Sequence, residues 1–342
     1  MTEPETESAS FWGRAMEGTQ WTTERVGMGL RLRVSYIQMG LYIILVMFGI
    51  LGNAAIVGII GTGLVRDHTS RRSSDMILVN MAFSNLMVSV TRNILLIMWD
   101  LGVEMYTSRG WCMFLMGLWV WLRSVNVWST LFLSAFHFRT LRRVAPISVK
   151  RGPSQLVYVT FGLIWSVNLL YSIPAFIFST RGDRNSTESL MLVSSTTRPL
   201  LGCTWDFPSV SSGLAYATIS MVIHESLPII MMTTTNVGSL LMLYTHRRSF
   251  LRAQSSNGAI MKRVPVERRA AKVILALNML FITSWGTSMI SINYFNYNRG
   301  PSTEYMLVIA RFANTAFIAF SPFVLAVGHR HIRGVLRSLL IN

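Results

Sequence analysis

Charged residues are scarce in this chain. They make up 13% of its 342 residues, while hydrophobic residues make up 51%. This composition leaves little for a soluble domain and favours one membrane domain. Acids are the rarer sign, with 15 Asp and Glu against 31 Lys and Arg. A net charge of +16 often marks a nucleic-acid-binding protein, but its meaning depends on where the charges lie along the chain.

Patterns typical of catalysis, metal binding and lipid anchoring are also missing. The six histidines show no H-E-x-x-H or similar spacing, so we predict no enzyme, no metal site and no cofactor. Residues 1–35 hold no positively charged start followed by an apolar segment, so no cleaved signal peptide is expected. The segment 329–342 has no cysteine that could be palmitoylated.

Long apolar stretches dominate the rest of the chain. Each is long enough to cross a hydrocarbon core of about 30 Å at about 1.5 Å of rise per residue. Their apolar residues are continuous rather than alternating, which favours helices over barrel strands. We therefore predict an all-α membrane protein with a seven-transmembrane helix bundle. The predicted spans are 36–64, 76–99, 111–138, 155–179, 213–244, 270–294 and 305–328.

Basic residues alternate between the two sides of these spans. One set of connections holds nineteen basic residues and three acids, and the other holds nine basic residues and eleven acids. The positive-inside rule makes the first set cytoplasmic. We therefore predict a multi-pass plasma membrane protein with an extracellular tail at 1–35, a membrane domain at 36–328 and a cytoplasmic tail at 329–342. The net charge then reflects topology and contact with membrane lipid, and no nucleic-acid partner is expected.

Only two cysteines are present, and both fall on the predicted outer side. Cys112 opens the third span, and Cys203 lies in the loop between the fourth and fifth spans. Pairing is the usual state in an oxidising compartment, and two free buried thiols are the alternative. A bridge across about ninety residues would stabilise the fold by about 4 to 5 kcal/mol. The same loop holds an N-x-S/T sequon that predicts glycosylation of Asn185.

Four ionisable residues fall inside the predicted spans, namely Arg92, Arg123, Glu225 and Arg311. A charge in the membrane costs at least about 2.5 to 3.5 kcal/mol, so each should face the bundle interior or a water-filled cavity. All four lie in the outer half or near the midplane, which allows them to converge on one pocket. In the alternative interpretation, Glu225 pairs with one arginine and the other arginines extend toward the interface.

The formal sum of these four charges is +2, which favours an acidic ligand. Guanidinium groups bind carboxylate or sulfate through two parallel hydrogen bonds. We predict that Arg123 and Arg311 hold a small organic acid, with Glu225 and His224 orienting them or accepting a ligand hydroxyl. The complete predicted ligand site is Arg92, Trp119, Arg123, His224, Glu225 and Arg311.

Several short sequence motifs lie in or at the ends of the predicted spans, in order along the chain. They are Gly-Asn at 52–53, Asn-Met-Ala-Phe-Ser-Asn-Leu at 80–86, Leu-Ser-Ala-Phe-His-Phe-Arg-Thr at 133–140, Leu-Tyr-Thr-His-Arg-Arg at 243–248, Pro-Val-Glu-Arg-Arg-Ala at 265–270 and Ser-Pro-Phe-Val-Leu at 321–325. In this order they resemble G-protein-coupled receptors, and more narrowly the vomeronasal type 1 pheromone receptors and their fish olfactory relatives. Asn85 stands where most rhodopsin-like receptors have an acid, and the vomeronasal type also lacks that acid. Pro228 and a long loop between spans five and six depart from the family pattern and favour a fish class-A-related olfactory receptor.

The resemblance implies a chemosensory pheromone or odorant receptor with two partners, a small-molecule ligand outside and a heterotrimeric G protein inside. Basic strings at the inner span ends would then flank a cleft opened by spans five and six. Alternatively, these strings only set topology and contact anionic lipids. The predicted coupling residues are His137, Arg139, Arg142, Arg247, Arg248 and Arg268.

Two other functions are alternatives to a pheromone or odorant receptor. A bitter-taste-type receptor is the nearest alternative, and the Cys112 and Cys203 pair argues against it because that family generally lacks the bridge. A small-solute transporter usually has more spans, with helices broken by glycine and proline.

Overall fold

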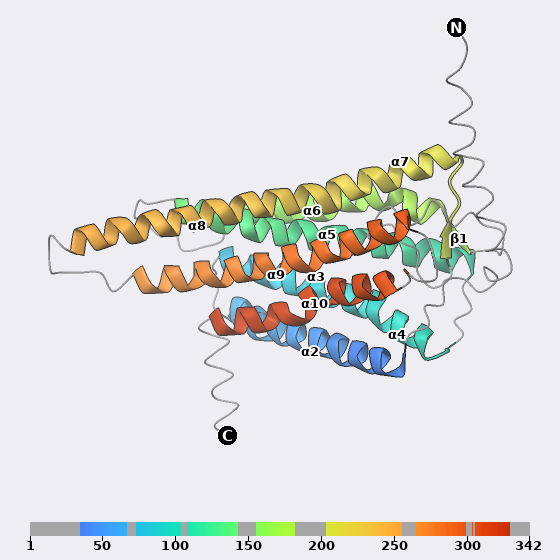
Figure 1. Ribbon diagram of the computed structural model, residues 1–342, viewed down its shortest axis with the longest axis horizontal. Helices are drawn as coiled ribbons and strands as arrows, with labels where there is room; N and C mark the ends of the chain where they lie inside the picture. Colours follow the sequence, from blue (N-terminus) through green and yellow to red (C-terminus); the bar gives the residue numbers. More distant parts are fainter. Residues whose placement is uncertain are drawn as a thin grey trace, which may run out of the picture.

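Seven long helical spans lie side by side in the computed structural model, which describes residues 35–66, 73–103, 108–142, 155–181, 203–254, 264–298, 303 and 305–328 (Figure 1). The first four spans are α2 (Tyr36–Arg66), then α3 (Ser73–Val88) with the π-helical turn η1 (Ser89–Asn93) and α4 (Ile94–Asp100), then α5 (Arg109–Arg142), then α6 (Gln155–Ile177). The last three are α7 (Val210–Met221) with the π-helical turn η3 (Val222–Ser226) and α8 (Leu227–Gln254), then α9 (Val264–Tyr297), then α10 (Tyr305–Gly328). The predicted all-α bundle is confirmed.

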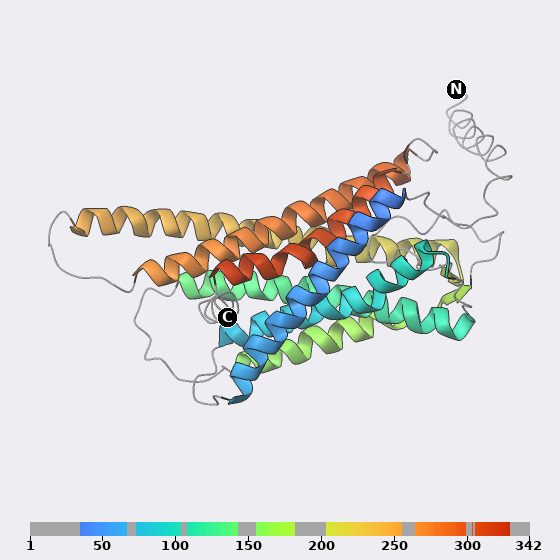
Figure 2. The same ribbon diagram turned by 90° about the horizontal axis from the view of Figure 1, so that it is seen from below.

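The predicted and observed spans differ most at one end of the bundle. Span five was expected to end at residue 244, but α8 continues to Gln254, and α9 begins at Val264 rather than at residue 270. Figures 1 and 2 show α8 projecting past the other helices at this end. Hydropathy reports only the part of a helix that is apolar, so polar extensions of the same helix are not counted in a predicted span.

The third span differs from the other six in composition. Within the described residues, six helical spans are long and apolar enough to cross a membrane, and α5 is not among them. Half of its 34 residues are buried, including the polar side chains of Arg123, Ser124, Asn126 and Ser129. Helices α3, α6, α8 and α9 all contact α5. Because protein rather than lipid surrounds α5, its interior positions tolerate polar residues that a lipid-facing helix would not.

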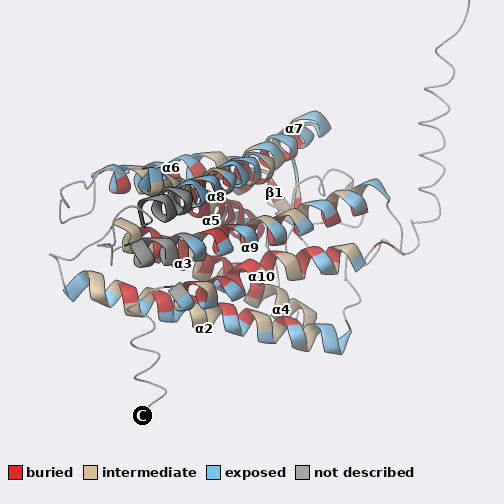
Figure 3. Ribbon diagram, turned by 60° about the vertical axis from the view of Figure 1, so that its left-hand side comes forward, coloured by how far each residue is buried: buried red, intermediate tan, exposed pale blue. Residues whose placement is uncertain are grey.

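The outer faces of the remaining helices are apolar. Figure 3 shows exposed residues along the outside of α2, α6 and α8, while buried residues face the interior. Large apolar side chains make up much of this exposed surface, for example Leu41, Ile44, Phe48, Leu163, Val167, Leu170, Ile230, Leu241 and Ile290. A surface of this kind would aggregate in water and is typical of contact with lipid tails.

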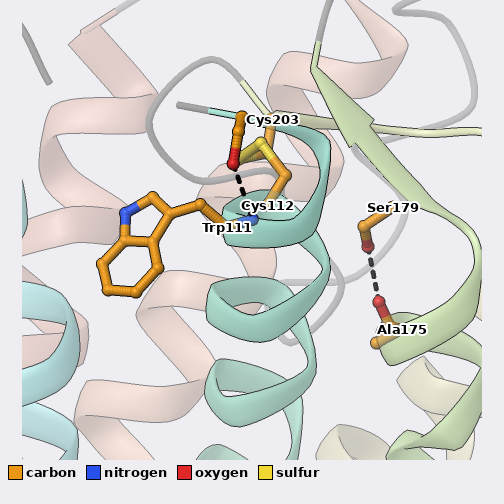
Figure 4. The surroundings of a disulfide bond; sticks show 6 residues. Trp111, Cys112, Ala175, Ser179 and Cys203 are labelled. Atoms are coloured by element: carbon orange, nitrogen blue, oxygen red, sulfur yellow. Dashed lines mark hydrogen bonds between the residues drawn. A yellow bond between two sulfur atoms is a disulfide. The ribbon is translucent and has the colours of Figure 1, made fainter. Parts of the chain in front are cut away.

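A short antiparallel pair of strands, which we call the hairpin, lies at one end of the bundle (Figure 1), and we call this end the disulfide end. Strands β1 (Ser179–Arg181) and β2 (Cys203–Trp205) pair antiparallel. The Cys203 sulfur is bonded to that of Cys112, in the first turn of α5, with a Cα–Cα distance of 5.5 Å (Figure 4). The predicted disulfide is confirmed, and it fastens the segment before span five to the start of span three.

Close approach of α2 and α10 depends on a glycine and an asparagine. A Cβ atom on Gly52 would lie 2.9 Å from the Pro322 ring, so a larger residue would force the two helices apart. The adjacent Asn53 donates to the backbone oxygen of Ile318 at 2.8 Å. It also accepts from Asn85 Nδ2 at 3.1 Å. The Gly-Asn string at 52–53 therefore joins spans one, two and seven.

The amide network continues into the centre of the bundle. Asn126 Nδ2 in α5 donates to Asn85 Oδ1 at 2.6 Å, and Asn85 Nδ2 donates to Ser321 Oγ at 3.2 Å. All three side chains are buried. Buried polar groups cost free energy unless they are hydrogen-bonded, so these mutual bonds hold four spans in one register.

Candidate ligand site

Two arginines contact the same tryptophan in the half of the bundle nearer the disulfide end. Arg92 lies in η1, and its guanidinium carbon is 4.4 Å from the centre of the Trp119 ring. Arg123 lies one turn after Trp119 on α5, and its guanidinium carbon is 5.4 Å from the same ring. All three side chains are at least 95% buried. A desolvated cation–π contact contributes about 2 kcal/mol, which offsets part of the cost of burying each charge.

Arg123 also joins the third span to the sixth and seventh. Its guanidinium carbon is 3.3 Å from the centre of the Trp285 ring on α9. Its Nη2 atom donates to Asn314 Oδ1 on α10 at 2.5 Å. Trp285 in turn stacks on Phe281, with ring centres 4.8 Å apart. A displacement of Arg123 would therefore change its contacts with both α9 and α10.

Arg311 on α10 has a counter-ion that the sequence did not reveal. Its Nη1 atom lies 2.5 Å from Asp100 Oδ2, at the end of α4. Its guanidinium carbon is also 3.8 Å from the centre of the Tyr42 ring on α2. The charge count had assigned Asp100 to an outer loop, whereas the structure places it inside the helical span with 13% of its side chain exposed. The only sequence signal for it was an acid directly after the apolar run at 94–99.

Several buried N–H groups in this cluster have no acceptor. Among the described residues, no hydrogen-bond partner is present for Arg92 Nε, Arg123 Nε, Trp119 Nε1 or Trp285 Nε1. Each buried donor left unpaired costs about 1 to 3 kcal/mol. These four residues therefore present more N–H donors than their neighbours accept, while the carboxylate of Asp100 forms an ion pair with Arg311 instead.

The charges of the cluster are close enough to interact. Arg123 is attracted by Glu225 and repelled by Arg92, while Arg92 is also repelled by Arg311. Three arginines and two acids, counting Asp100, sum to +1. The positive excess and the unpaired N–H donors thus occur in the same group of residues.

His224 and Glu225 lie in the π-helical turn η3 and are both 1% exposed. His224 Nε2 is 3.0 Å from Asn168 Oδ1 on α6. Its ring centre lies 4.4 Å from that of Tyr171. The structure thus brings Arg92, Trp119 and Arg123 into direct contact, with Glu225 within electrostatic range of Arg123, while His224 packs against α6. π-Helical turns are frequent at functional sites, and both turns of this kind in the described residues hold predicted ligand residues.

A row of aromatic rings leads from His224 to the disulfide hairpin. The Tyr171 ring stacks on that of Tyr216 with centres 5.2 Å apart, and the Tyr216 ring lies 5.8 Å from that of Trp205. Trp205 is the last residue of β2, two residues after Cys203. The hairpin therefore packs against the same helices that carry the candidate ligand residues.

The predicted coupling residues lie at the other end of the bundle. Arg139 and Arg142 are exposed, and His137 is partly buried. Arg247, Arg248 and Arg268 fall within α8 and α9, but their side chains lie outside the described part, as does the whole of Asn185.

A neutral polar cluster that the sequence did not predict lies on α5, α8 and α9. Asn278 Nδ2 on α9 donates to Ser134 Oγ on α5 at 2.8 Å and to Asn236 Oδ1 on α8 at 2.7 Å. Ser134 Oγ is also 2.6 Å from Thr235 Oγ1. We call Ser134, Thr235, Asn236 and Asn278 the amide clasp. It holds spans three, five and six together.

Comparison with known proteins places this architecture among receptors. Residues 35–338 match the model of the vomeronasal organ pheromone receptor family. The chain is 40% identical over 311 residues to olfactory receptor class A-like protein 4 of Danio rerio, covering 88% of this chain and 90% of that protein. It is 27% identical over 197 residues to C-X-C chemokine receptor type 3 of Canis lupus familiaris, covering 56% of this chain and 47% of that protein.

Proposed function

Because this chain belongs to the vomeronasal organ pheromone receptor family, and is thus a chemosensory G-protein-coupled receptor rather than an enzyme, we propose that its ligand is a small organic acid and that it signals through a heterotrimeric G protein. We further propose that the disulfide end faces outside. Support for this orientation comes from the basic residues, which gather at the connections of the opposite end.

One observation carries the proposal of an acidic ligand. Arg92, Arg123, Trp119 and Trp285 present buried N–H groups that have no acceptor within the described residues. A carboxylate or sulfate is acceptor-only, and it forms its strongest hydrogen bonds with guanidinium groups. Binding such a group would satisfy these donors and neutralise the positive excess in a single step. An amine would add donors and positive charge to a site that already has too many.

The geometry favours Arg92 and Arg123 as the anchors of the anion. The pairing of Arg123 with Arg311 predicted from the sequence is less favourable, because Asp100 already neutralises Arg311 at 2.5 Å. Trp119 contacts both preferred anchors and would pack against the ligand. We retain Glu225 and His224 as groups that orient the anchors or accept a ligand hydroxyl.

Binding at Arg123 would be transmitted through its existing contacts. The guanidinium stacks on Trp285 of α9 and bonds Asn314 of α10. A ligand anion that draws Arg123 toward itself changes the relative stability of these contacts. If the active arrangement of the helices binds the anion more tightly, the ligand shifts the population toward that arrangement.

A panel of matched compounds tests the acid preference. We expect carboxylates and sulfates to stimulate nucleotide exchange on a G protein in membranes that hold the receptor, and amines and neutral alcohols of the same skeleton to be inactive. Membranes from cells that do not express the receptor serve as the control. A preference for amines would refute the acid site, and transport of the ligand without any nucleotide exchange would favour the transporter alternative.

The amide clasp supplies a second prediction, on basal signalling. Asn278→Ala removes two interhelical hydrogen bonds and leaves Ser134 and Asn236 without them, which favours separation of spans five and six by about 1 to 3 kcal/mol. We expect basal nucleotide exchange to rise at least about fivefold. Thr283→Ala on the same helix is the matched control, because Thr283 is exposed and bonds only backbone oxygens of its own helix. Unchanged basal exchange in a normally expressed Asn278→Ala receptor would exclude the clasp as a lock.

A further inference from the structure

The ion pair between Asp100 and Arg311 stands out in the ligand site because both partners are mostly buried. Their side chains are 13% and 6% exposed, and the two charged atoms are 2.5 Å apart. The Arg311 Nε and Nη2 atoms are buried and have no hydrogen-bond partner within the described residues. Arg311 thus has its charge neutralised while two of its nitrogens remain available to a further acceptor.

Asp100 is the last residue of α4, directly before a well-defined helix end. Val103 N donates to Met98 O and Gly102 N donates to Trp99 O, both at 3.1 Å, and Gly102 adopts a φ of +83°. These bonds form a Schellman motif, which ends α4 directly after Asp100. An acid in the last turn of a helix is disfavoured by the helix dipole. Arg311 therefore offsets an unfavourable position as well as a buried charge.

The presence of Asp100 changes the charge that the site offers to a ligand. Without it, Arg92, Arg123, Arg311 and Glu225 sum to +2, and with it the sum is +1. Resting on the proposed function, we infer that Asp100 is the receptor's own counter-ion for Arg311 and restricts the site to ligands with a single negative charge. A second anionic group on a ligand would have to compete with a carboxylate that already forms an ion pair with Arg311 at 2.5 Å.

Asp100 is thereby a specificity-determining residue rather than an anchor. In the receptor as it stands, the anion binds near Arg92 and Arg123, and the Arg311 end of the site meets an uncharged part of the ligand. Close charge pairs in protein interfaces are coupled by at least about 1.5 kcal/mol, which corresponds to at least about tenfold in affinity. Removing the internal competitor should therefore be visible in a dose–response curve.

The test compares matched monocarboxylates and dicarboxylates, with hexanoate against adipate and benzoate against terephthalate. The readout is nucleotide exchange in receptor membranes, normalised to receptor at the cell surface. We expect the unmodified receptor to prefer the monocarboxylate of each pair. Asp100→Asn should raise the potency of the dicarboxylate relative to its partner by at least about tenfold, because Arg311 is released. Asp206→Asn, at an exposed acid near the hairpin, should change neither potency.

A second pair of variants keeps the inference testable if Asp100→Asn is retained inside the cell. Arg311→Gln lowers the sum of charges to zero and should weaken monocarboxylates at least about tenfold. Adding Asp100→Asn to it restores the sum of +1 and should return potency to within about threefold, with no gain for dicarboxylates. A double variant as weak as Arg311→Gln would refute the counter-ion role.

The same measurements test the acid ligand and the counter-ion role of Asp100 separately. If neither monocarboxylates nor dicarboxylates activate the unmodified receptor, both the acid ligand and the counter-ion role are wrong. If monocarboxylates activate it and Asp100→Asn leaves the selectivity unchanged, only the counter-ion role is wrong.

Discussion

An Arg123→Gln receptor is expected to need at least about thirtyfold more acid for half-maximal activation. In the proposed site Arg123 forms a buried, hydrogen-bonded charge pair with the ligand anion, and removing one partner of such a pair costs about 2 to 5 kcal/mol of binding free energy. A loss of about 2 kcal/mol corresponds to about thirtyfold in affinity. The loss should be large because Arg123 is 1% exposed and water cannot replace its charge. Dose–response curves for nucleotide exchange, corrected for surface expression, measure the effect.

Two companion variants separate charge from geometry at this position. Arg123→Lys keeps the charge but loses the planar group that stacks on Trp285, so we expect an intermediate potency. Arg109→Gln removes an exposed arginine from the first turn of the same helix and should have no effect. An Arg123→Gln receptor with normal potency and normal expression would remove Arg123 from the ligand site.

Loss of the disulfide should have the second large effect. The bridge joins residues 91 positions apart, and the loop-entropy model gives about 4 to 5 kcal/mol for a loop of this length. We expect Cys203→Ser to reduce the receptor at the cell surface severalfold and to lower its melting temperature in detergent. The acid response of the remaining receptor should fall as well, because the hairpin packs through Trp205 and Tyr216 toward the helices of the site.

The double variant Cys112→Ala/Cys203→Ala distinguishes loss of the bridge from release of a reactive thiol. If the bridge is responsible, the double variant should resemble each single variant. A double variant that behaves like the unmodified receptor would show that unpaired thiols, and not the missing bridge, cause the defect.

The sequence predicted the bundle well because the physics of a membrane span is local. An apolar run long enough to cross the membrane core identifies a helix without knowledge of its neighbours, and α10 begins and ends at the predicted residues. Even the third span was predicted, although its buried Arg123 and Asn126 make it less apolar than the others. The residues around these two positions are apolar enough for the span to be identified from the sequence.

Partners across the bundle could not be predicted in the same way. The depth of Arg92, Arg123 and Arg311 in their spans predicted that each faces the bundle interior and allowed them to converge on one pocket. Which acid each one contacts depends on helix rotation and on where α4 ends, so Asp100 was mistaken for a loop residue. The amide clasp could not be predicted for a similar reason, because Asn278 and Ser134 are 144 residues apart in the sequence. Neutral polar side chains also cost less free energy in a span than charges do, so their presence alone does not indicate a partner.

The π-helical turn in the second span has a consequence for comparing this receptor with its relatives. A π turn contains about one residue more than an α turn, so the part of the helix after η1 is rotated by about 100° relative to an uninterrupted α-helix. The stretch that ends at Asp100 is therefore offset by one position from the stretch that packs around Asn85. A relative with one residue fewer here would present a different face to the ligand while its deeper half stayed in register. Gain or loss of a single codon would then be enough to alter chemical selectivity.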